Sequence, residues 1–507
     1  MTNLYDLLRQ HFPTDRAQTV LELADGRRIS YADLEAGAGR VARLLLDCGV
    51  QPGDRVAAQI EKSPEALLLY LAVLRCGAVY LPLNTAYKGG EVAYFLEDAE
   101  PRVLVCAPEN EAALRQVADK AGVPTVLTLG EAGDGSVVER SRGLDPEVPV
   151  VARDPDDLAA ILYTSGTTGR SKGAMLSHAN LGSNSLTLRD YWGFTADDVL
   201  IHALPMFHTH GLFVATHCVL LSGSRMLFLN RFDADTVIDL LPRATAMMGV
   251  PTFYTRLLAS PRLNREACAG IRLFISGSAP LLADTFKAFE ERTGHRILER
   301  YGMTETTMNT SNPLEGERIA GTVGFPLPGV EVRVTDEDGS PLPQGEVGVL
   351  EVKGPNVFRG YWRQPDKTAA EFRPDGFFIT GDVAMIDARG YVHIVGRAKD
   401  LIISGGFNVY PKEIELCIDL IAGVQESAVI GVPHPDFGEA VVAVVKRDGS
   451  GAAVTAEAVQ ATAKAELANF KVPKKVFFVD ELPRNTMGKV QKNLLRERFK
   501  DSFSSAA

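Results

Sequence analysis

The residues best suited to chemistry lie between Tyr163 and Gly173, where hydroxyls and glycines gather around one lysine. They follow an apolar run at 158–162 that predicts a buried strand. Glycines let backbone N–H groups face an anion, hydroxyls donate further hydrogen bonds, and a lysine adds positive charge. The spacing excludes a Walker A loop, which needs its lysine directly after a glycine. We therefore predict a different polyphosphate-binding loop, in preference to a flexible surface loop, formed by Thr164, Ser165, Gly166, Thr167, Thr168, Gly169 and Lys172.

Three further segments carry side chains that could act on a nucleotide. Tyr301 can lie flat against a planar base, and Glu305, on the same segment, is a hard oxygen ligand suited to Mg²⁺. Asp382 can bind two vicinal ribose hydroxyls, although an aspartate at such a position also caps turns. Lys489 follows a glycine near the carboxyl end, and taken alone it predicts only a solvated side chain.

The elements that must position these residues alternate between helix and strand in the first half of the chain. Ser30 begins one predicted helix, and Ser63 with Pro64 begins the next. Alternation of this kind predicts parallel sheets with helices on both faces. Beyond about residue 320, the segments 330–335 and 347–353 alternate apolar with polar residues, which predicts a small antiparallel or barrel-like subdomain.

The predicted fold class is α/β, with two domains. A large N-terminal domain at 1–396 contains parallel sheets flanked by helices and a small β-barrel-like subdomain at about 320–396. A new α+β pattern begins at Leu401, so we predict a smaller C-terminal domain at 397–507. A chain of 507 residues is long enough to support more than one core.

The composition excludes several classes of protein. A formal net charge of −11 argues against sequence-independent binding of nucleic acid. The six cysteines lie far apart without a C-x-x-C pair, which is typical of reduced thiols. The amino terminus lacks the features of a secretory signal, and the most apolar predicted helix, at 66–74, is too short to span a bilayer. We therefore predict a cytoplasmic protein that binds neither membranes nor nucleic acid.

In this order and spacing, the segments resemble the motifs of the adenylate-forming superfamily, which includes acyl-CoA synthetases, peptide-synthetase adenylation domains and beetle luciferases. The loop at 163–173 resembles its phosphate loop, 298–305 its adenine and metal motif, and 276–280 the turn that flanks the base. The resemblance covers essentially the whole chain and implies ATP, Mg²⁺ and coenzyme A as cofactor and co-substrates. Beyond the phosphate loop, it implies a metal ligand at Glu305 and nucleotide contacts from Ser278, Ala279, Glu299, Tyr301, Gly302, Met303, Thr304, Asp382 and Arg397.

The resemblance also assigns roles in the C-terminal domain. Lys489 would reach the carboxylate and the α-phosphate during adenylation, acting with Glu305 and Thr164. In that superfamily the smaller domain is mobile and rotates about a hinge, here at Lys399. One pose would present Lys489, and the other a glycine loop that walls a tunnel for the pantetheine arm of coenzyme A. The residues of this loop are Ser404, Gly405, Gly406 and Phe407.

Four histidines lie close together at 202, 208, 210 and 217. Their spacing fits neither a zinc-protease helix nor a zinc finger, and no Asp or Glu accompanies them between 201 and 220, where the one cysteine is Cys218. The segment 205–211 instead resembles the wall of the acyl pocket in related enzymes. We predict that His208 and Thr209 contact the acid, and that His202 and His217 are structural.

Within the superfamily, the segments 208–213, 249–256 and 299–312 most closely resemble the malonyl-CoA synthetases, with Thr307 as a departure that leaves the motif intact. Malonate would bring a second carboxylate into an apolar pocket, where it requires a cation. We predict that Arg256 meets this carboxylate, with Ser278 as a hydroxyl partner and Met303 in the same pocket. The alternative is that Arg256 is an ordinary solvated arginine.

The activity that the resemblance implies is conversion of malonate, coenzyme A and ATP to malonyl-CoA, AMP and pyrophosphate. Methylmalonate and other short-chain acids remain alternative substrates, because one methyl group changes binding by only about 1–3 kcal/mol. A carrier protein could also replace coenzyme A. A silent nucleotide-binding protein is disfavoured because Lys172, Glu305, Asp382, Arg397 and Lys489 are all present. We expect a monomer or a weak homo-oligomer.

Overall fold

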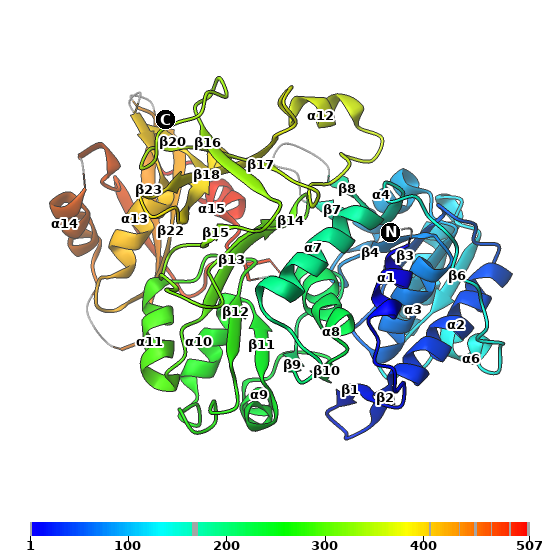
Figure 1. Cartoon of the computed structure of the whole chain (residues 1–507). Coiled ribbons are helices and arrows are strands. Elements are labelled where there is room, and N and C mark those ends of the chain that lie inside the picture. The colour runs from blue at the N-terminus through cyan, green and yellow to red at the C-terminus, as the bar shows by residue number, and fades with distance from the viewer. Residues whose placement is uncertain are drawn as a thin grey trace. The chain divides into compact units, whose positions relative to one another are not determined.

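The chain divides into two compact units, and Figure 1 labels their helices and strands. The computed structural model describes residues 3–164, 171–404, 407–434, 437–450, 454–467, 469–485 and 488–503. The first unit comprises Met1–Val332 and Val352–Phe378, and the second comprises Arg333–Glu351 and Ile379–Ala507.

One sheet of the first unit has six strands in the order β6-β5-β3-β4-β7-β8. Its neighbours are parallel except for β7 and β8, which pair antiparallel. The buried strand predicted at 158–162 is confirmed as part of β7, where Ile161 packs in a core with Phe95 and Leu104. The strands are β3 (Arg55–Gln59), β4 (Val79–Pro82), β5 (Val103–Cys106), β6 (Thr125–Thr128), β7 (Leu158–Thr164) and β8 (Lys172–Ser177).

The other sheet of the first unit has nine strands in the order β15-β14-β13-β12-β11-β9-β10-β1-β2. It is parallel from β13 to β1 and antiparallel at both edges. Ligands of such sheets bind beyond the carboxyl ends of the parallel strands. The strands are β1 (Thr19–Leu23), β2 (Arg28–Ser30), β9 (Val199–His202), β10 (Arg225–Phe228), β11 (Ala246–Gly249), β12 (Leu273–Ser276), β13 (Leu298–Met303), β14 (Thr307–Ser311) and β15 (Phe325–Pro326).

The helices of the first unit begin where the capping residues predict. Ser30 and Asp33 form a capping box at the start of α2, and Ser63 caps α3 with Pro64 in its first turn. No helix in the described ranges has both the length and the apolar character needed to cross a membrane. The helices are α1 (Leu4–Gln10), α2 (Tyr31–Asp47), α3 (Pro64–Arg75), α4 (Gly89–Ala99), α5 (Glu111–Lys120), α6 (Ser136–Ser141), α7 (His178–Tyr191), α8 (Thr216–Ser222), α9 (Ala234–Leu240), α10 (Pro251–Ala259), α11 (Ala283–Thr293) and α12 (Pro365–Ala370), with shorter turns η1 (Pro108–Asn110), η2 (His210–Ala215) and η3 (Leu241–Arg243).

The second unit contains two further sheets, ordered β16-β17-β18-β19 and β21-β20-β23-β22, with β24 pairing with β23. The long strands β22 and β23 are buried on both faces. Val429 and Val441 face a core that includes α13 and α14, whereas Ile430 and Val442 face a core that includes α15. The elements are β16 (Glu331–Thr335), β17 (Val347–Lys353), β18 (Phe378–Ile386), β19 (Val392–Arg397), η4 (Ala398–Asp400), β20 (Ile402–Ser404), β21 (Phe407–Val409), α13 (Pro411–Asp419), β22 (Val424–His434), β23 (Gly438–Arg447), α14 (Ala456–Glu466), η5 (Asn469–Lys471), β24 (Lys475–Val479) and α15 (Lys492–Phe499).

The α/β fold class is confirmed, with a larger unit of mainly parallel sheets and a smaller second unit. The two units do not divide at residue 396. Much of the β-rich segment that we predicted within the larger domain belongs to the second unit, because its strands pair with one another and β19 contacts α13. The predicted domain boundary itself stays a prediction.

Candidate active site

Thr164 and Lys172 face each other at the base of the predicted phosphate loop. They are directly paired at the end of the β7–β8 hairpin, and the hydroxyl of Thr164 lies 3.5 Å from the carbonyl oxygen of Lys172. The loop between them includes Ser165, Gly166, Thr167, Thr168 and Gly169, which lie outside the described residues. The hairpin thus fixes both ends of the loop, and the contacts within it stay a prediction.

Glu305 is buried close to this hairpin. Its Oε1 lies 3.4 Å from the hydroxyl of Thr164 and 3.2 Å from the hydroxyl of Tyr361. In the described part of the chain, no group of three or more His, Cys, Asp or Glu residues could hold a metal ion. A single carboxylate nonetheless fits Mg²⁺ at a nucleotide, because this ion is usually bound by one or two carboxylates together with phosphates and water.

Strand β13 presents the adjoining residues of the predicted adenine motif. Gly302 sits where a Cβ atom would lie 1.8 Å from the carbonyl oxygen of Thr307, so only glycine fits there. Tyr301 lies on the same strand, half-buried, with Met303 and Thr304 following it. Glu299 has a supporting role: its Oε1 accepts a hydrogen bond of 3.1 Å from the backbone N–H of Leu281. The strand thereby holds the turn that carries the next group of predicted residues.

That turn contains Ser278 and Ala279. Ser278 has a φ of 71°, in the left-handed region that costs an L-residue energy, and its hydroxyl lies 3.2 Å from Nδ1 of His210. Strained residues held by surrounding structure are often functional. Of the clustered histidines, His210 lies next to Ser278, and the predicted contact of His208 with the acid stays a prediction. His208 is half-buried, and its Nδ1 accepts a bond of 3.3 Å from the backbone N–H of His210.

The residue that sequence reasoning missed is Arg300. Its side chain is only 3% exposed, and its guanidinium lies against Gly277, where a Cβ atom would come within 2.3 Å of Cζ. Its Nε and Nη2 have no hydrogen-bond partner among the described residues. Burial lowers the pKa of Arg300 to about 9, so the side chain is still a cation at neutral pH.

Three buried polar atoms on the segments 209–210 and 276–278 also have no hydrogen-bond partner among the described residues. They are Nε2 of His210, Oγ of Ser276 and Oγ1 of Thr209. Burial, followed by the charge of Arg300, holds the pKa of His210 well below its ordinary range, so this ring is neutral. Buried polar groups without partners are rare, and each calls for an explanation such as a ligand or a water molecule. Arg300 and the His210 ring on which its charge acts are therefore a cationic, hydrogen-bonding pair that suits an anion.

Arg256 lies on α10, exposed, two residues after Tyr254, whose hydroxyl donates 2.6 Å to the carbonyl of Ile275. Its predicted role toward the second carboxylate stays a prediction.

The two remaining histidines of the cluster, His202 and His217, are fully buried. His202 contacts the ammonium of Lys62 at 2.8 Å, and His217 lies 2.9 Å from the hydroxyl of Tyr70 and 2.8 Å from that of Ser185. Their surroundings are those of structural residues.

In the second unit, Asp382 and Arg397 are directly paired on β18 and β19. Nε of Arg397 lies 2.7 Å from Oδ1 of Asp382, and the hydroxyl of Thr380 accepts a bond of 3.0 Å from the backbone N–H of Asp382. The carboxylate is buried and held by a cation, which fixes its position and keeps it ionised.

The segment that carries Lys489 is a small hairpin. The backbone N–H of Lys489 donates to Oδ1 of Asn485, and the N–H of Asn485 donates to the carbonyl of Lys489, each at 2.9 Å. Arg484 joins this hairpin to β22, since it pairs with Glu426 and donates to the carbonyl of Gly488. The backbone of Lys489 is thus anchored from both sides.

The predicted hinge and tunnel residues follow β19. Lys399 lies in η4, and burial lowers its pKa. The next residue, Asp400, pairs with Arg496 of α15 at 2.5 Å. Ser404 is buried at the end of β20 and pairs with Phe407 of β21. Gly405 and Gly406, the centre of the predicted tunnel wall, lie outside the described residues.

Comparison with known proteins shows what the chain is similar to. Residues 9–362 match the model of the AMP-binding enzyme family, and residues 413–489 match the model of the AMP-binding enzyme C-terminal domain. A feruloyl-CoA synthase of an Amycolatopsis species is 36% identical over 94% of both chains. A malonate–CoA ligase of Arabidopsis thaliana is 32% identical over 94% of this chain and 86% of its own length. The crystal structure of ATP-bound MatB from Rhodopseudomonas palustris superposes with a TM-score of 0.97, at 61% identity over 99% of this chain and 100% of that one.

Proposed function

The chain belongs to the AMP-binding enzyme family, and we propose that it is a malonate–CoA ligase. It is an AMP-forming acid–thiol ligase that uses ATP, Mg²⁺ and coenzyme A. In the first half-reaction a carboxylate oxygen of malonate attacks the α-phosphorus of ATP, and pyrophosphate leaves. In the second, the thiol of coenzyme A attacks the acyl carbon, and AMP leaves with the bridging oxygen.

The observation that carries the choice of acid is the buried, unpaired guanidinium of Arg300. A monoacid with an apolar tail would leave this cation uncompensated, whereas the distal carboxylate of malonate would pair with it. The neutral ring of His210, whose Nε2 has no partner among the described residues, would supply a further hydrogen bond to the same group. Arg256, on the exposed face of α10, would add long-range attraction for a dianion.

The predicted nucleotide-binding residues would each take one part of ATP. Lys172 and Thr164 would bind the polyphosphate, Tyr301 the base, and Asp382 the ribose hydroxyls with Arg397 holding its carboxylate. Glu305 would hold Mg²⁺, which when bound neutralises phosphate charge. Lys489 would place a cation between the attacking carboxylate and the α-phosphate, where two anions must approach. Ser404, Gly405, Gly406 and Phe407 would line the path of the pantetheine arm, and Lys399 would act as the hinge.

Pyrophosphate release measured over a set of acids tests this function. With ATP and Mg²⁺, malonate should give the highest kcat/KM, followed by methylmalonate, with propionate and ferulate far behind. Malonyl-CoA should appear by mass spectrometry only when coenzyme A is present. A higher kcat/KM for ferulate or propionate would contradict the assignment of a diacid. Transfer to a carrier protein but not to coenzyme A would favour the carrier-loading alternative. We place the enzyme in the cytoplasm, as a monomer or weak homo-oligomer.

A further inference from the structure

A charged network joins Lys172 to Glu305 through two residues outside the predicted motifs, Glu371 and Tyr361. The ammonium of Lys172 lies 3.0 Å from Oε1 of Glu371 and 4.2 Å from the centre of the Tyr361 ring. The hydroxyl of Tyr361 lies 2.6 Å from Oε2 of Glu371 and 3.2 Å from Oε1 of Glu305. A phenol has one proton, so it serves one of these carboxylates at a time, and the shorter distance favours Glu371.

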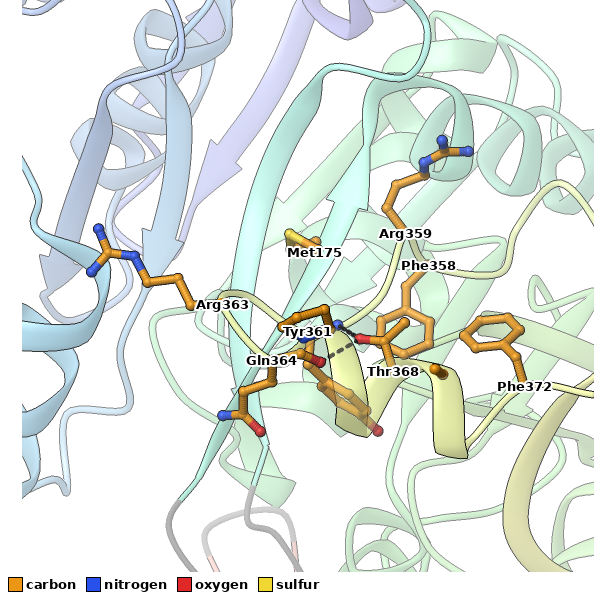
Figure 2. A pocket seen from close by; sticks show the side chains of 10 residues that line it. Met175, Phe358, Arg359, Tyr361, Arg363, Gln364, Thr368 and Phe372 are labelled. Atoms are coloured by element: carbon orange, nitrogen blue, oxygen red, sulfur yellow. Dashed lines mark hydrogen bonds between the residues drawn. The ribbon is translucent and has the colours of Figure 1, made fainter.

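The structure around Tyr361 fixes the position of its ring. Its backbone N–H donates to the hydroxyl of Thr368 at 2.9 Å, and that hydroxyl donates to the carbonyl of Gln364 at 2.9 Å, as Figure 2 shows. The ring of Phe358 meets the ring of Tyr361 edge-on at 4.9 Å. Tyr361 therefore holds a fixed position, in which its ring contacts Lys172 and its hydroxyl contacts Glu371.

The cavity drawn in Figure 2, of about 620 Å³, lies beside Tyr361. Arg359 and Arg363 border it, but both point away from it in Figure 2 and pair with Asp156 and Glu100. Because its inner wall is largely aromatic and aliphatic, the cavity offers no fixed charge to a ligand. The chemistry of this region lies in the carboxylate of Glu371 instead.

Glu371 accepts bonds from more than one cation. Besides Lys172 and Tyr361, it pairs with Lys367, one turn earlier, whose ammonium is 3.0 Å from Oε1. Burial alone would raise the pKa of Glu371, but the hydrogen bonds from Tyr361, Lys367 and Lys172 outweigh it and lower the pKa. Glu371 is therefore an anion that would keep two donors if Lys172 moved away.

We propose that Glu371 is a positioning residue that takes the place of a phosphate: it holds the ammonium of Lys172 while no nucleotide is bound. This inference rests on the proposed role of Lys172 at the polyphosphate. Carboxylate and phosphate oxygens compete for the same N–H groups, so Lys172 exchanges Glu371 for the nucleotide. Lys367 and Tyr361 keep the released carboxylate hydrogen-bonded, which avoids the cost of an unpaired buried charge. When pyrophosphate leaves, Glu371 takes the ammonium back.

The exchange makes Glu371 a competitor of both ATP and pyrophosphate. Glu371→Gln, which keeps the shape but removes the charge, should bind MgATP and magnesium pyrophosphate about tenfold more tightly by calorimetry, as expected for one lost charge-assisted competitor. Pyrophosphate should also inhibit this variant at correspondingly lower concentrations. Damage to the fold weakens binding, so a gain in affinity distinguishes competition from a structural role. Unchanged or weaker binding in Glu371→Gln would overturn the proposal.

Lys367→Ala provides the opposite perturbation. It leaves Glu371 with fewer donors, so the carboxylate holds Lys172 more strongly and MgATP should bind several-fold more weakly. The double variant should behave like Glu371→Gln, because Lys367 acts through Glu371. Lys367 is 44% exposed, so its replacement keeps the test available even if Glu371→Gln is unstable. Arg359→Ala is the matched control: it removes one cation near the same cavity without touching the network and should leave the dissociation constant within about twofold.

Lys172→Ala separates this inference from the proposed function. If it binds MgATP as tightly as the wild type, Lys172 does not bind the polyphosphate, and both ideas fail. If it weakens MgATP binding but Glu371→Gln does not tighten it, only the exchange role of Glu371 is refuted.

Discussion

Replacing Arg300 by Met should convert the enzyme from a diacid ligase into a poor monoacid ligase. Methionine has a similar length and no charge, so it fills much of the same space against Gly277. The side chain of Arg300 is 3% exposed, so solvent does not screen its interaction with a bound carboxylate. Removing one partner of a buried ion pair costs about 3–5 kcal/mol, so kcat/KM for malonate should fall by roughly 100-fold or more.

The measurement is kcat/KM for malonate and for propionate, by pyrophosphate release, in wild type and variant. Propionate has no distal charge, so its kcat/KM should stay level or rise, and the dissociation constant of MgATP should not change. Arg300→Lys keeps a point charge but loses the bidentate geometry of the guanidinium. Its kcat/KM for malonate should therefore lie between those of the wild type and Arg300→Met. The variant Arg300→Met should also melt at a higher temperature, because an unpaired buried cation destabilises the free enzyme. An equal loss for both acids would refute the reasoning.

Three further outcomes follow from other parts of the structure. Arg256→Ala should reduce kcat/KM for malonate by only about tenfold, because an exposed cation is screened, and this loss should shrink with added salt; a salt-independent loss would argue for direct contact. Lys489→Ala should abolish the pyrophosphate burst yet leave transfer from supplied malonyl-adenylate to coenzyme A largely intact; equal loss of both half-reactions would refute this division. Burial raises the pKa of Asp419 to about 7, above its unfolded value, so this residue should make the protein lose stability as pH rises from about 4 to 7. Asp419→Asn should therefore raise the melting temperature at pH 8 relative to wild type. A melting temperature below that of the wild type would contradict the raised pKa of Asp419.

The fold could be predicted from the sequence because its signals are local. The capping residues Ser30 and Ser63 and the apolar run at 158–162 each specify an element without reference to the rest of the chain. The division into units could not be predicted in the same way. The strands at 333–351 look continuous with the first unit along the chain, and only their pairing with β18 and β19 joins them to the second.

The residues of the candidate site could likewise be predicted only in part. Asp382 and Arg397 could be expected to lie together from motifs, and the structure pairs them across two strands. Sequence reasoning missed Arg300 because an arginine side chain is usually solvated. The burial of this one depends on Gly277, which directly follows the neighbouring strand β12. A signal was present, because Arg300 lies inside the predicted adenine and metal motif at 298–305. Glu371 gave no signal, since it is 199 residues from Lys172 and in no motif.

The most direct test of the central claim is the fate of oxygen from malonate. With malonate labelled by ¹⁸O in both carboxylates, attack on the α-phosphorus and later thiol attack at the acyl carbon must leave one labelled oxygen in AMP. Mass spectrometry of the products should show one ¹⁸O per AMP, none in pyrophosphate, and malonyl-CoA in equal amount. Labelled orthophosphate with ADP, or unlabelled AMP, would contradict a malonyl-adenylate intermediate and with it the proposed function.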